Sequence, residues 1–151
     1  MVGPNKSHGK TYQAIDEGFF KTCFAHLTED WSEFTFVDLG CGKGRALLLA
    51  RELGFRRIIG VEFAPSLAKT ARRNCSFAEI EIGDAAQYAF PSGPLVVFMY
   101  NPFDENVMCQ VIQHLPSCYV AYMNPLYDGL FESVDQPIFR SKEFSIWLRK
   151  I

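Results

Sequence analysis

The residues best suited to ligand chemistry lie in a glycine-rich segment, Gly40-Cys41-Gly42-Lys43-Gly44. An apolar, β-branched stretch comes directly before this segment and a strong helix-forming stretch follows it, so we expect a strand-to-helix turn. Glycine lets the backbone approach a ligand closely, and the first turn of a helix has unpaired N–H groups. The segment therefore predicts a site that could hold a carboxylate or a phosphate.

The spacing of these glycines differs from that of two nucleotide-binding motifs. A dinucleotide-binding turn has the pattern GxGxxG, whereas Gly40-x-Gly42-x-Gly44 is one residue shorter. A P-loop needs GxxxxGK followed by Ser or Thr, whereas Lys43 is followed by Gly44. A tight turn without a ligand is the structural alternative, and three glycines within five residues argue against it.

Acidic residues follow the next two predicted strands. Glu62 lies about 20 residues after the glycine-rich segment, where a carboxylate can accept hydrogen bonds from ribose hydroxyls. Phe63 beside it could cover one face of an adenine or belong to the core. Asp84 in Gly83-Asp84-Ala85 could accept a hydrogen bond from an adenine amine, although Gly-Asp is also ordinary turn chemistry.

A fourth candidate loop contains Asn101-Pro102-Phe103, directly after a strongly apolar stretch. The Asn101 amide oxygen and a carbonyl beside Pro102 can accept hydrogen bonds, and Phe103 could form a pocket wall. The alternative is a simple Asn-Pro turn at the end of a strand. Because of its predicted place beside the glycine-rich turn, we favour a functional role for this loop.

The elements that must position these loops alternate between strand and helix. Strands are predicted at 34–39, 57–63, 79–82, 95–100 and 119–123, helices at 11–28, 45–53, 64–75 and 106–115, a short helix near 127–132, and a closing hairpin at 136–140 and 144–148. This alternation predicts a three-layer α/β fold with an open, mainly parallel sheet and a carboxyl-terminal antiparallel hairpin. Ligands bind such sheets at the carboxyl ends of the strands, where all the candidate loops lie.

Taken together, these motifs resemble the class I S-adenosylmethionine-dependent methyltransferases, which have a seven-stranded, Rossmann-like fold. The segment from Asp38 to Gly44 is similar to their first motif. Glu62 matches their ribose-binding acid, Asp84 their adenine-side acid, and the segment 101–103 their motif after the fourth strand. More narrowly, the chain resembles small bacterial members of unassigned substrate, and it lacks the second Pro of the related amine-methyltransferase motif.

The resemblance implies S-adenosylmethionine as cofactor, S-adenosylhomocysteine as product and no metal. The implied cofactor-binding residues are Asp38, Gly40, Cys41, Gly42, Gly44, Glu62, Phe63, Asp84, Ala85 and Asn101. The implied catalytic residues are Asn101, Pro102, Phe103 and Tyr12. In this family the amino-terminal segment often covers the pocket, so the stretch 6–12 is a candidate lid or, alternatively, a frayed terminus.

Length and composition fit one domain. The 151 residues are 48% hydrophobic, so we expect a single domain over 1–151, with an amino-terminal helix or lid in 1–30 and a sheet core in 34–151.

The net charge of −2 argues against general nucleic-acid binding without excluding it, and no apolar stretch could span a membrane. Five cysteines without a CxxC pair and no visible signal peptide favour the cytoplasm. The oligomeric state is left open.

The function predicted from these features is methyl transfer to a small-molecule or protein nitrogen or oxygen nucleophile. The acceptor and the general base are not identifiable from the sequence. A nicotinamide dinucleotide-dependent oxidoreductase is one alternative, and a non-catalytic domain that binds S-adenosylmethionine is another.

Overall fold

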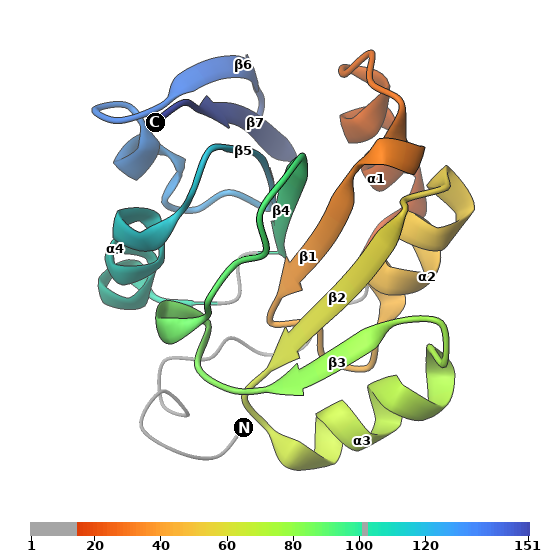
Figure 1. Ribbon diagram of the computed structural model, residues 1–151. Helices are drawn as coiled ribbons and strands as arrows, with labels where there is room; N and C mark the ends of the chain where they lie inside the picture. The colour runs from red at the N-terminus through yellow and green to blue at the C-terminus, as the bar shows by residue number, and fades with distance from the viewer. Residues whose placement is uncertain (1–14, 101–102) are drawn as a thin grey trace.

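A seven-stranded sheet forms the centre of the protein (Figure 1). The computed structural model describes residues 15–100 and 103–151. The strand order is β3-β2-β1-β4-β5-β7-β6, and the strands are β1 (Thr35–Leu39), β2 (Arg57–Glu62), β3 (Glu79–Ile82), β4 (Leu95–Tyr100), β5 (Cys118–Met123), β6 (Gln136–Arg140) and β7 (Phe144–Arg149). The first five strands pair in parallel and the last two are antiparallel, which confirms the predicted fold class.

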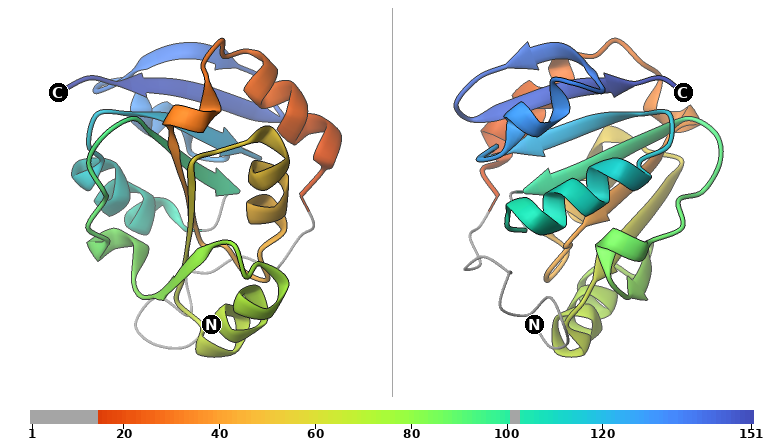
Figure 2. Two further views of the ribbon diagram at one scale, coloured as in Figure 1. Left: turned by 45° about the vertical axis from the view of Figure 1, so that its right-hand side comes forward. Right: turned by 90° about the vertical axis from the view of Figure 1, so that its left-hand side faces the viewer.

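Helices cover both faces of this sheet (Figure 2). The α-helices are α1 (Glu17–Ala25), α2 (Arg45–Leu53), α3 (Pro65–Asn74) and α4 (Glu105–His114), and the short 3-10 helices are η2 (Trp31–Glu33), η3 (Ala85–Gln87) and η4 (Asp128–Phe131). The helices α1, α2 and α3 lie on one face, and α4, η3 and η4 lie on the other. None of the helices within the described ranges is long and apolar enough to cross a membrane.

Two apolar layers hold the helices to the sheet. The layer under α1 and α2 is rich in aromatic rings, and the ring centroids of Phe20 and Phe98 lie 5.3 Å apart. The opposite layer joins α4 to the sheet through side chains such as Val107 and Met108. Because β4 contributes Phe98 to one layer and Met99 to the other, its apolar sequence serves both faces, as expected for a central strand.

Most predicted elements agree with the structure to within one or two residues, and the first helix is the exception. Within the described residues it runs from Glu17 to Ala25, because the Asp16 carboxylate accepts a hydrogen bond from the Phe19 N–H at 2.9 Å and caps the helix. The predicted helix began at residue 11, outside the described residues. The 3-10 helices η2 and η3 were not predicted, because a single short turn leaves no periodic pattern.

A buried ion pair joins the end of β7 to α4. The Arg149 guanidinium binds both carboxylate oxygens of Asp135, at 2.5 and 2.9 Å, and each residue is only 8% exposed. The same guanidinium donates hydrogen bonds to the carbonyls of Ile112 and Leu115, at 2.8 and 3.2 Å. These carbonyls lie at the carboxyl-terminal end of α4, so one side chain satisfies a helix end and a buried carboxylate together.

We expect Asp135→Ala to destabilise the fold by about 3–5 kcal/mol, because it leaves the Arg149 charge buried without its partner. Chemical denaturation measures this change in the free energy of unfolding. The exposed Arg57–Glu79 pair, whose shortest N–O distance is 2.6 Å, is the control, and Glu79→Gln should cost less than about 1 kcal/mol. Equal effects of the two substitutions would contradict the role given to the buried pair.

Candidate functional site

The candidate loops meet at the carboxyl edge of the parallel strands, which is the lower end of the sheet in Figure 1. The strand β1 lies between β2 and β4, so the chain leaves β1 in opposite directions to build the two halves of the sheet. Such a reversal of strand order opens a crevice at the carboxyl ends of the strands, and ligands of α/β folds bind there. The loops after β1, β2 and β4 border this position.

The glycine-rich turn is tied to the neighbouring strand by its backbone. The N–H groups of Gly40 and Cys41 both donate to the Val61 carbonyl, at 2.8 and 3.0 Å. Gly42 and Gly44 have φ of 55° and 98°, a left-handed conformation that glycine adopts without strain. The turn thus lies against the end of β2. It leads from β1 into α2, as the sequence predicted.

The carboxylate of Glu62 fixes the shape of this turn. One carboxylate oxygen accepts a hydrogen bond from the Gly42 N–H at 2.9 Å, and the other accepts from the Ala64 N–H at 2.8 Å. Glu62 is only 5% exposed. An ionised carboxylate has about four acceptor positions, so each oxygen keeps one for a further donor. The predicted ribose acceptor therefore also organises the loop beside it.

Asp38 places a second acid near Glu62. Asp38 is 3% exposed, and burial, together with the negative charge of Glu62, raises the pKa of its carboxyl well above the ordinary value. Within 15–100 and 103–151, no side chain or backbone group donates a hydrogen bond to this carboxyl. Two acids in one buried place favour a cationic partner, because a positive charge would offset both burial and mutual repulsion.

Three further residues support the turn and were not singled out from the sequence. A Cβ on Gly60 would lie 2.7 Å from the Cys41 sulfur, so the absence of a side chain on β2 makes room for the turn. The Asn74 amide donates to the Lys43 carbonyl at 3.0 Å, and the Cys75 thiol donates to the Gly44 carbonyl at 3.4 Å. A glycine inside an apolar strand is a signal for such close backbone approach, whereas nothing in the sequence pairs 43–44 with 74–75.

The buried thiol of Cys41 faces the strand below the turn. Its residue is 6% exposed, and burial is the largest cause that raises the pKa of this thiol, with the acids Asp38 and Glu62 adding to the effect. A protonated thiol is a weak nucleophile. Cys41 is therefore not suited to act as a nucleophile, and its predicted place in a binding loop stays a prediction.

The loop after β3 joins the same edge. The Gly83 N–H donates to the Glu62 carbonyl at 3.1 Å, and one Asp84 carboxylate oxygen accepts from the Ala86 N–H at 2.9 Å. Asp84 is half-buried, Ala85 is buried, and Phe63 is partly exposed beside them. The Asp84 carboxylate thus caps the first turn of η3 and keeps its second oxygen for another donor.

The structure brings together only part of the predicted acceptor site. Asn101, Pro102 and Tyr12 lie outside the described residues, so their predicted catalytic roles stay predictions. Phe103 is 7% exposed and packs in the apolar layer under α4. In the structure Phe103 is therefore a core residue, and its role as a pocket wall stays a prediction.

No group of three or more metal-ligating side chains occurs within the described ranges. The pair Cys23 and His26 on the first helix has zinc-like spacing but no second pair. Burial raises the pKa of the Cys23 thiol to about 12, so Cys23 belongs to the core. The exposed His26 ring lies tilted against Phe139, with ring centroids 4.0 Å apart.

Comparison with known sequences identifies the segment that carries these loops. The profile of a family described as "Methyltransferase domain" matches residues 36–123. The ribosomal protein L11 methyltransferase of Thiobacillus denitrificans is 31% identical over 74 residues, which is 49% of this chain and 23% of that protein. The enzyme of the same name from Burkholderia ambifaria is 29% identical over 65 residues, 43% of this chain and 22% of its own length. The matches thus span less than a quarter of these curated relatives.

Solved structures share the fold at low sequence identity. The PH0226 protein of Pyrococcus horikoshii superposes with a TM-score of 0.72 over 89% of both chains at 12% identity. A ribosomal protein L11 methylase of Lactobacillus delbrueckii subsp. bulgaricus superposes with a TM-score of 0.59, at 16% identity, over 78% of this chain and 70% of its own. These similarities describe the architecture of the chain.

We expect Gly60→Ala to destabilise the protein by about 1–3 kcal/mol, because the new methyl group would overlap the Cys41 sulfur. Chemical denaturation measures the loss. Gly83→Ala is the matched control, since no atom would lie within 4 Å of its Cβ, and its effect should stay within about 0.5 kcal/mol. Adding Cys41→Ala to Gly60→Ala should recover part of the loss, and a larger combined loss would contradict this explanation.

The raised pKa of Asp38 predicts how stability changes with pH. Above the ordinary value of 3.8, the unfolded chain releases the Asp38 proton while the folded chain keeps it, so rising pH favours unfolding until the raised pKa is passed. We expect Asp38→Asn to gain stability relative to the natural protein as the pH rises above the ordinary value, and this gain to level off once the raised pKa of Asp38 is passed.

Urea unfolding at a series of pH values measures the difference between the two proteins. Asp30→Asn is the control, because hydrogen bonds from Ser32 lower the pKa of exposed Asp30 and its difference should be flat over the same range. A natural protein that gains stability relative to Asp38→Asn as the pH rises would contradict the assignment.

Proposed function

The chain belongs to the family of methyltransferase domains, with S-adenosylmethionine as its cofactor, and we propose that it methylates a nitrogen or oxygen nucleophile of a small molecule or a protein. The observation that supports this proposal is the buried pair of acids, Asp38 and Glu62, beside a glycine turn that hydrogen bonds hold against the end of β2. When bound, the cofactor supplies a methyl group already activated by a sulfonium sulfur.

The residues of the edge fit the charges of this cofactor. Its sulfonium and ammonium groups are cationic, so a bound cofactor beside Glu62 would favour the ionised form of Asp38, whose pKa is raised in the free protein by burial and by Glu62. We assign the methionine end of the cofactor to the turn from Gly40 to Gly44, with Asp38 nearest the ammonium group. The Glu62 oxygens, each with a free acceptor position, would bind the ribose hydroxyls.

The adenine end is assigned to the loops after β2 and β3. The second Asp84 oxygen would accept from the exocyclic amine, and the backbone at Ala85 would border the ring edge. The partly exposed ring of Phe63 would cover one face of the adenine. These assignments use only groups that the described hydrogen bonds leave available.

The acceptor role of the loop after β4 rests on the family resemblance. In this proposal the Asn101 amide and the Pro102 carbonyl orient the nucleophile, Phe103 supports the loop from the core, and Tyr12 belongs to a segment that covers the pocket. Residues 1–151 would act as one domain. The described part of the segment 1–30 includes α1, whose buried Phe20 packs into the core, so covering the pocket would fall to the stretch 6–12.

The protein contributes to this reaction mainly by positioning the two reacting groups and by keeping water out of the site. A methyl transfer of this kind is an in-line displacement, so the protein aligns the nucleophile with the sulfonium carbon and excludes water. An ammonium acceptor must lose its proton before attack. Tyr122 is fully buried, and burial raises the pKa of its hydroxyl to about 12, so this phenol stays protonated and is not suited to accept that proton.

The family match favours methyl transfer over a nicotinamide-dependent reaction. The curated relatives are named as methyltransferases of ribosomal protein L11, which supports a protein acceptor as one possibility within the proposed class. A domain that binds the cofactor without transferring its methyl group is the alternative that turnover measurements must exclude.

Two substitutions should separate cofactor binding from turnover. We expect Glu62→Ala to weaken S-adenosylmethionine binding by about 10- to 150-fold, the range for losing hydrogen bonds to a charged group worth about 1.5–3 kcal/mol. Asn101→Ala should leave that affinity nearly unchanged and lower turnover. Calorimetric titration measures the affinity, and release of S-adenosylhomocysteine in the presence of cell extract measures turnover.

NADH is the control ligand in the titration and should not bind. An unchanged affinity in Glu62→Ala would overturn the ribose assignment, and a collapse of affinity in Asn101→Ala would overturn the acceptor assignment. Binding without any S-adenosylhomocysteine release from a range of extracts would favour the non-catalytic alternative.

A further inference from the structure

The charged residues of the protein are distributed unequally along the chain. Residues 43–73 contain eight of the 15 Lys and Arg residues but only two of the 17 Asp and Glu residues. One of these two acids is the buried Glu62. The net charge of −2 is therefore the sum of a basic segment, which contains α2, β2 and nearly all of α3, and an acidic remainder.

The helices α2 and α3 bring most of these cations to one surface. Both helices lie on the same face of the sheet (Figure 1). They touch at the start of α2, where a Cβ on Gly44 would lie 3.7 Å from the Ala71 Cβ and the Asn74 amide binds the Lys43 carbonyl at 3.0 Å. We call this surface the basic face, and its cations, all of them exposed, are Lys43, Arg45, Arg51, Lys69, Arg72 and Arg73.

The acids nearest in sequence do not balance these cations. Glu52 is the one acid on α2 and α3. On β3, Ile80 belongs to the apolar layer under these helices, so Glu79 and Glu81 on either side of it point to the opposite face of the sheet. Glu79 is also paired with Arg57, which is not part of the basic face. The basic face therefore has six cations against one acid.

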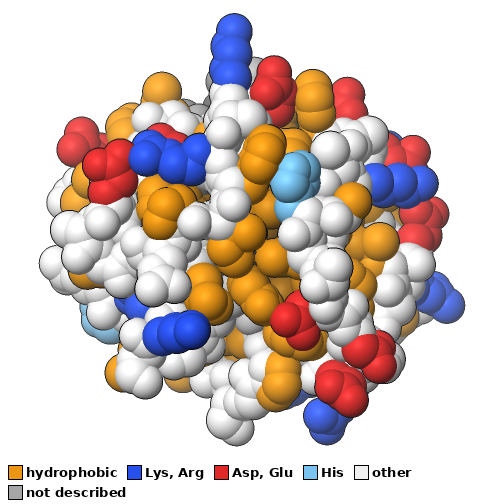
Figure 3. All heavy atoms as spheres, turned by 90° about the horizontal axis from the view of Figure 1, so that it is seen from above, with side chains coloured by type: hydrophobic (Ala, Val, Ile, Leu, Met, Phe, Trp, Pro, Cys, Tyr) orange, Lys and Arg blue, Asp and Glu red, His pale blue; other side chains and the backbone are white. Residues whose placement is uncertain are grey.

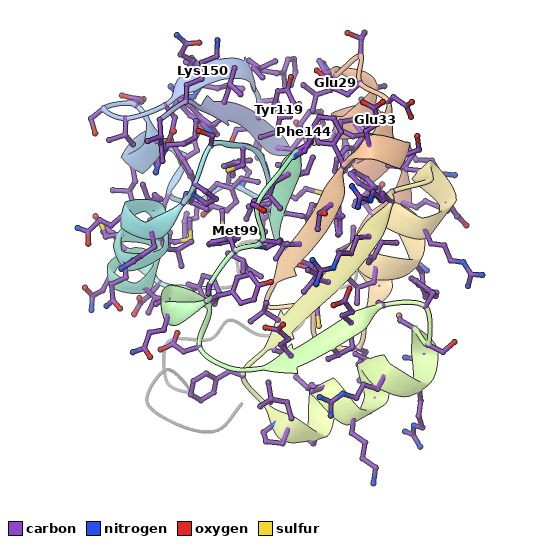
Figure 4. All side chains as sticks on the ribbon, in the orientation of Figure 1. Glu29, Glu33, Met99, Tyr119, Phe144 and Lys150 are labelled. Carbon is purple, nitrogen blue, oxygen red and sulfur yellow. The ribbon has the colours of Figure 1, made fainter. Side chains whose placement is uncertain are left out.

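The opposite end of the molecule has a different charge pattern. Figure 4 shows Glu29 and Glu33 at the upper end of the molecule, whereas α3 lies at the lower end. Figure 3 looks onto the upper end and shows acidic and basic side chains mixed around an apolar middle. The excess of positive charge on α2 and α3 is thus a property of one part of the surface.

The cations of α3 are not neutralised within the fold. Among residues 15–100 and 103–151, no carboxylate lies within ion-pair distance of Lys69, Arg72 or Arg73. The Arg72 guanidinium donates a hydrogen bond to the Ile80 carbonyl at 3.0 Å, which holds the side chain in place but leaves its charge. Because residues three and four apart are neighbours on a helix, the three side chains leave α3 on one side.

The basic face offers a partner positive charge and little apolar surface. Leu48 is the one exposed large hydrophobic residue of α2 and α3. Burial of apolar area would therefore contribute little to binding, whereas membranes and protein partners bind largely through such burial. Attraction to a dense array of negative charge must supply the affinity. Duplex nucleic acid carries one negative charge per about 1.7 Å of its axis and binds proteins mainly through its phosphates.

We propose that the basic face binds the phosphate backbone of a double-stranded nucleic acid without reading its base sequence. The three cations of α3 would contact neighbouring phosphates, and Lys43, beside the end of this helix, would add a fourth contact. Guanidinium groups can bind a phosphate through two parallel hydrogen bonds. Stacking on bases needs an open aromatic face, whereas the Phe77 ring beside this surface has the Arg51 guanidinium 4.6 Å from its centroid.

The test measures binding of the full chain to a fluorescein-labelled DNA duplex of about 20 base pairs by fluorescence anisotropy. No cofactor is added, so the result is independent of the proposed methyl transfer. We expect a dissociation constant of about 1–100 µM at physiological salt, and equal affinity for a second duplex of unrelated sequence. The logarithm of the binding constant should fall with the logarithm of salt concentration with a slope of about −3.6, for about four phosphate contacts.

Two matched double variants locate the contact. Lys69→Gln/Arg73→Gln should weaken binding about tenfold, at about threefold for each ion pair lost, and should reduce the magnitude of the salt slope by about 2. Lys142→Gln/Lys150→Gln removes the same charge from the hairpin of β6 and β7 and should leave affinity and slope unchanged. All four side chains are exposed, so we expect both variants to fold.

The two variants and two further polyanions decide the outcome. Equal losses in both double variants would show attraction by net charge alone and would overturn the proposal. So would the absence of binding at about 100 µM protein, the weak end of the expected range. Tighter binding of a poly-glutamate peptide, or of phosphatidylglycerol vesicles, than of the duplex would replace the nucleic acid with an acidic protein or a membrane.

Discussion

The hydrogen bonds of the Glu62 carboxylate are the interaction on which the carboxyl edge of the sheet depends. This carboxylate ends one strand, caps the backbone that follows at Ala64, and binds the Gly42 N–H of a turn from the neighbouring strand. Because both bonds are to backbone groups in a buried place, they resist competition from water. The turn is therefore shaped before any ligand arrives, and binding need not first order it.

The negative charge of Glu62 also raises the free energy of ionised Asp38 when no cation is bound. A second acid in a buried place raises the free energy of the charged form. A ligand with positive charge would relieve this cost, so part of its binding energy would come from strain present in the free protein. In the proposed function, Asp38 would therefore lower the stability of the free protein and strengthen the binding of a cationic ligand, a combination that is common at binding sites.

The two edges of the sheet differ in their chemistry. At the carboxyl edge, backbone groups of the glycine turn and buried acids are arranged by hydrogen bonds within the fold. At the amino edge, aromatic and aliphatic side chains form an open floor with Glu29 and Lys150 at its rim. The parallel sheet separates these two regions.

The sequence by itself determined the fold class, the strand-to-helix turn at 40–44 and the acid at the end of β2, because periodicity and glycine spacing are local properties of the chain. It also indicated the edge of the sheet at which Asp84 lies. Only the tertiary structure decided that Glu62 binds Gly42, that Gly60 makes room for Cys41, and that Asn74 holds the turn. These contacts join residues distant in sequence, and they depend on the order and register of the strands, which no local pattern encodes.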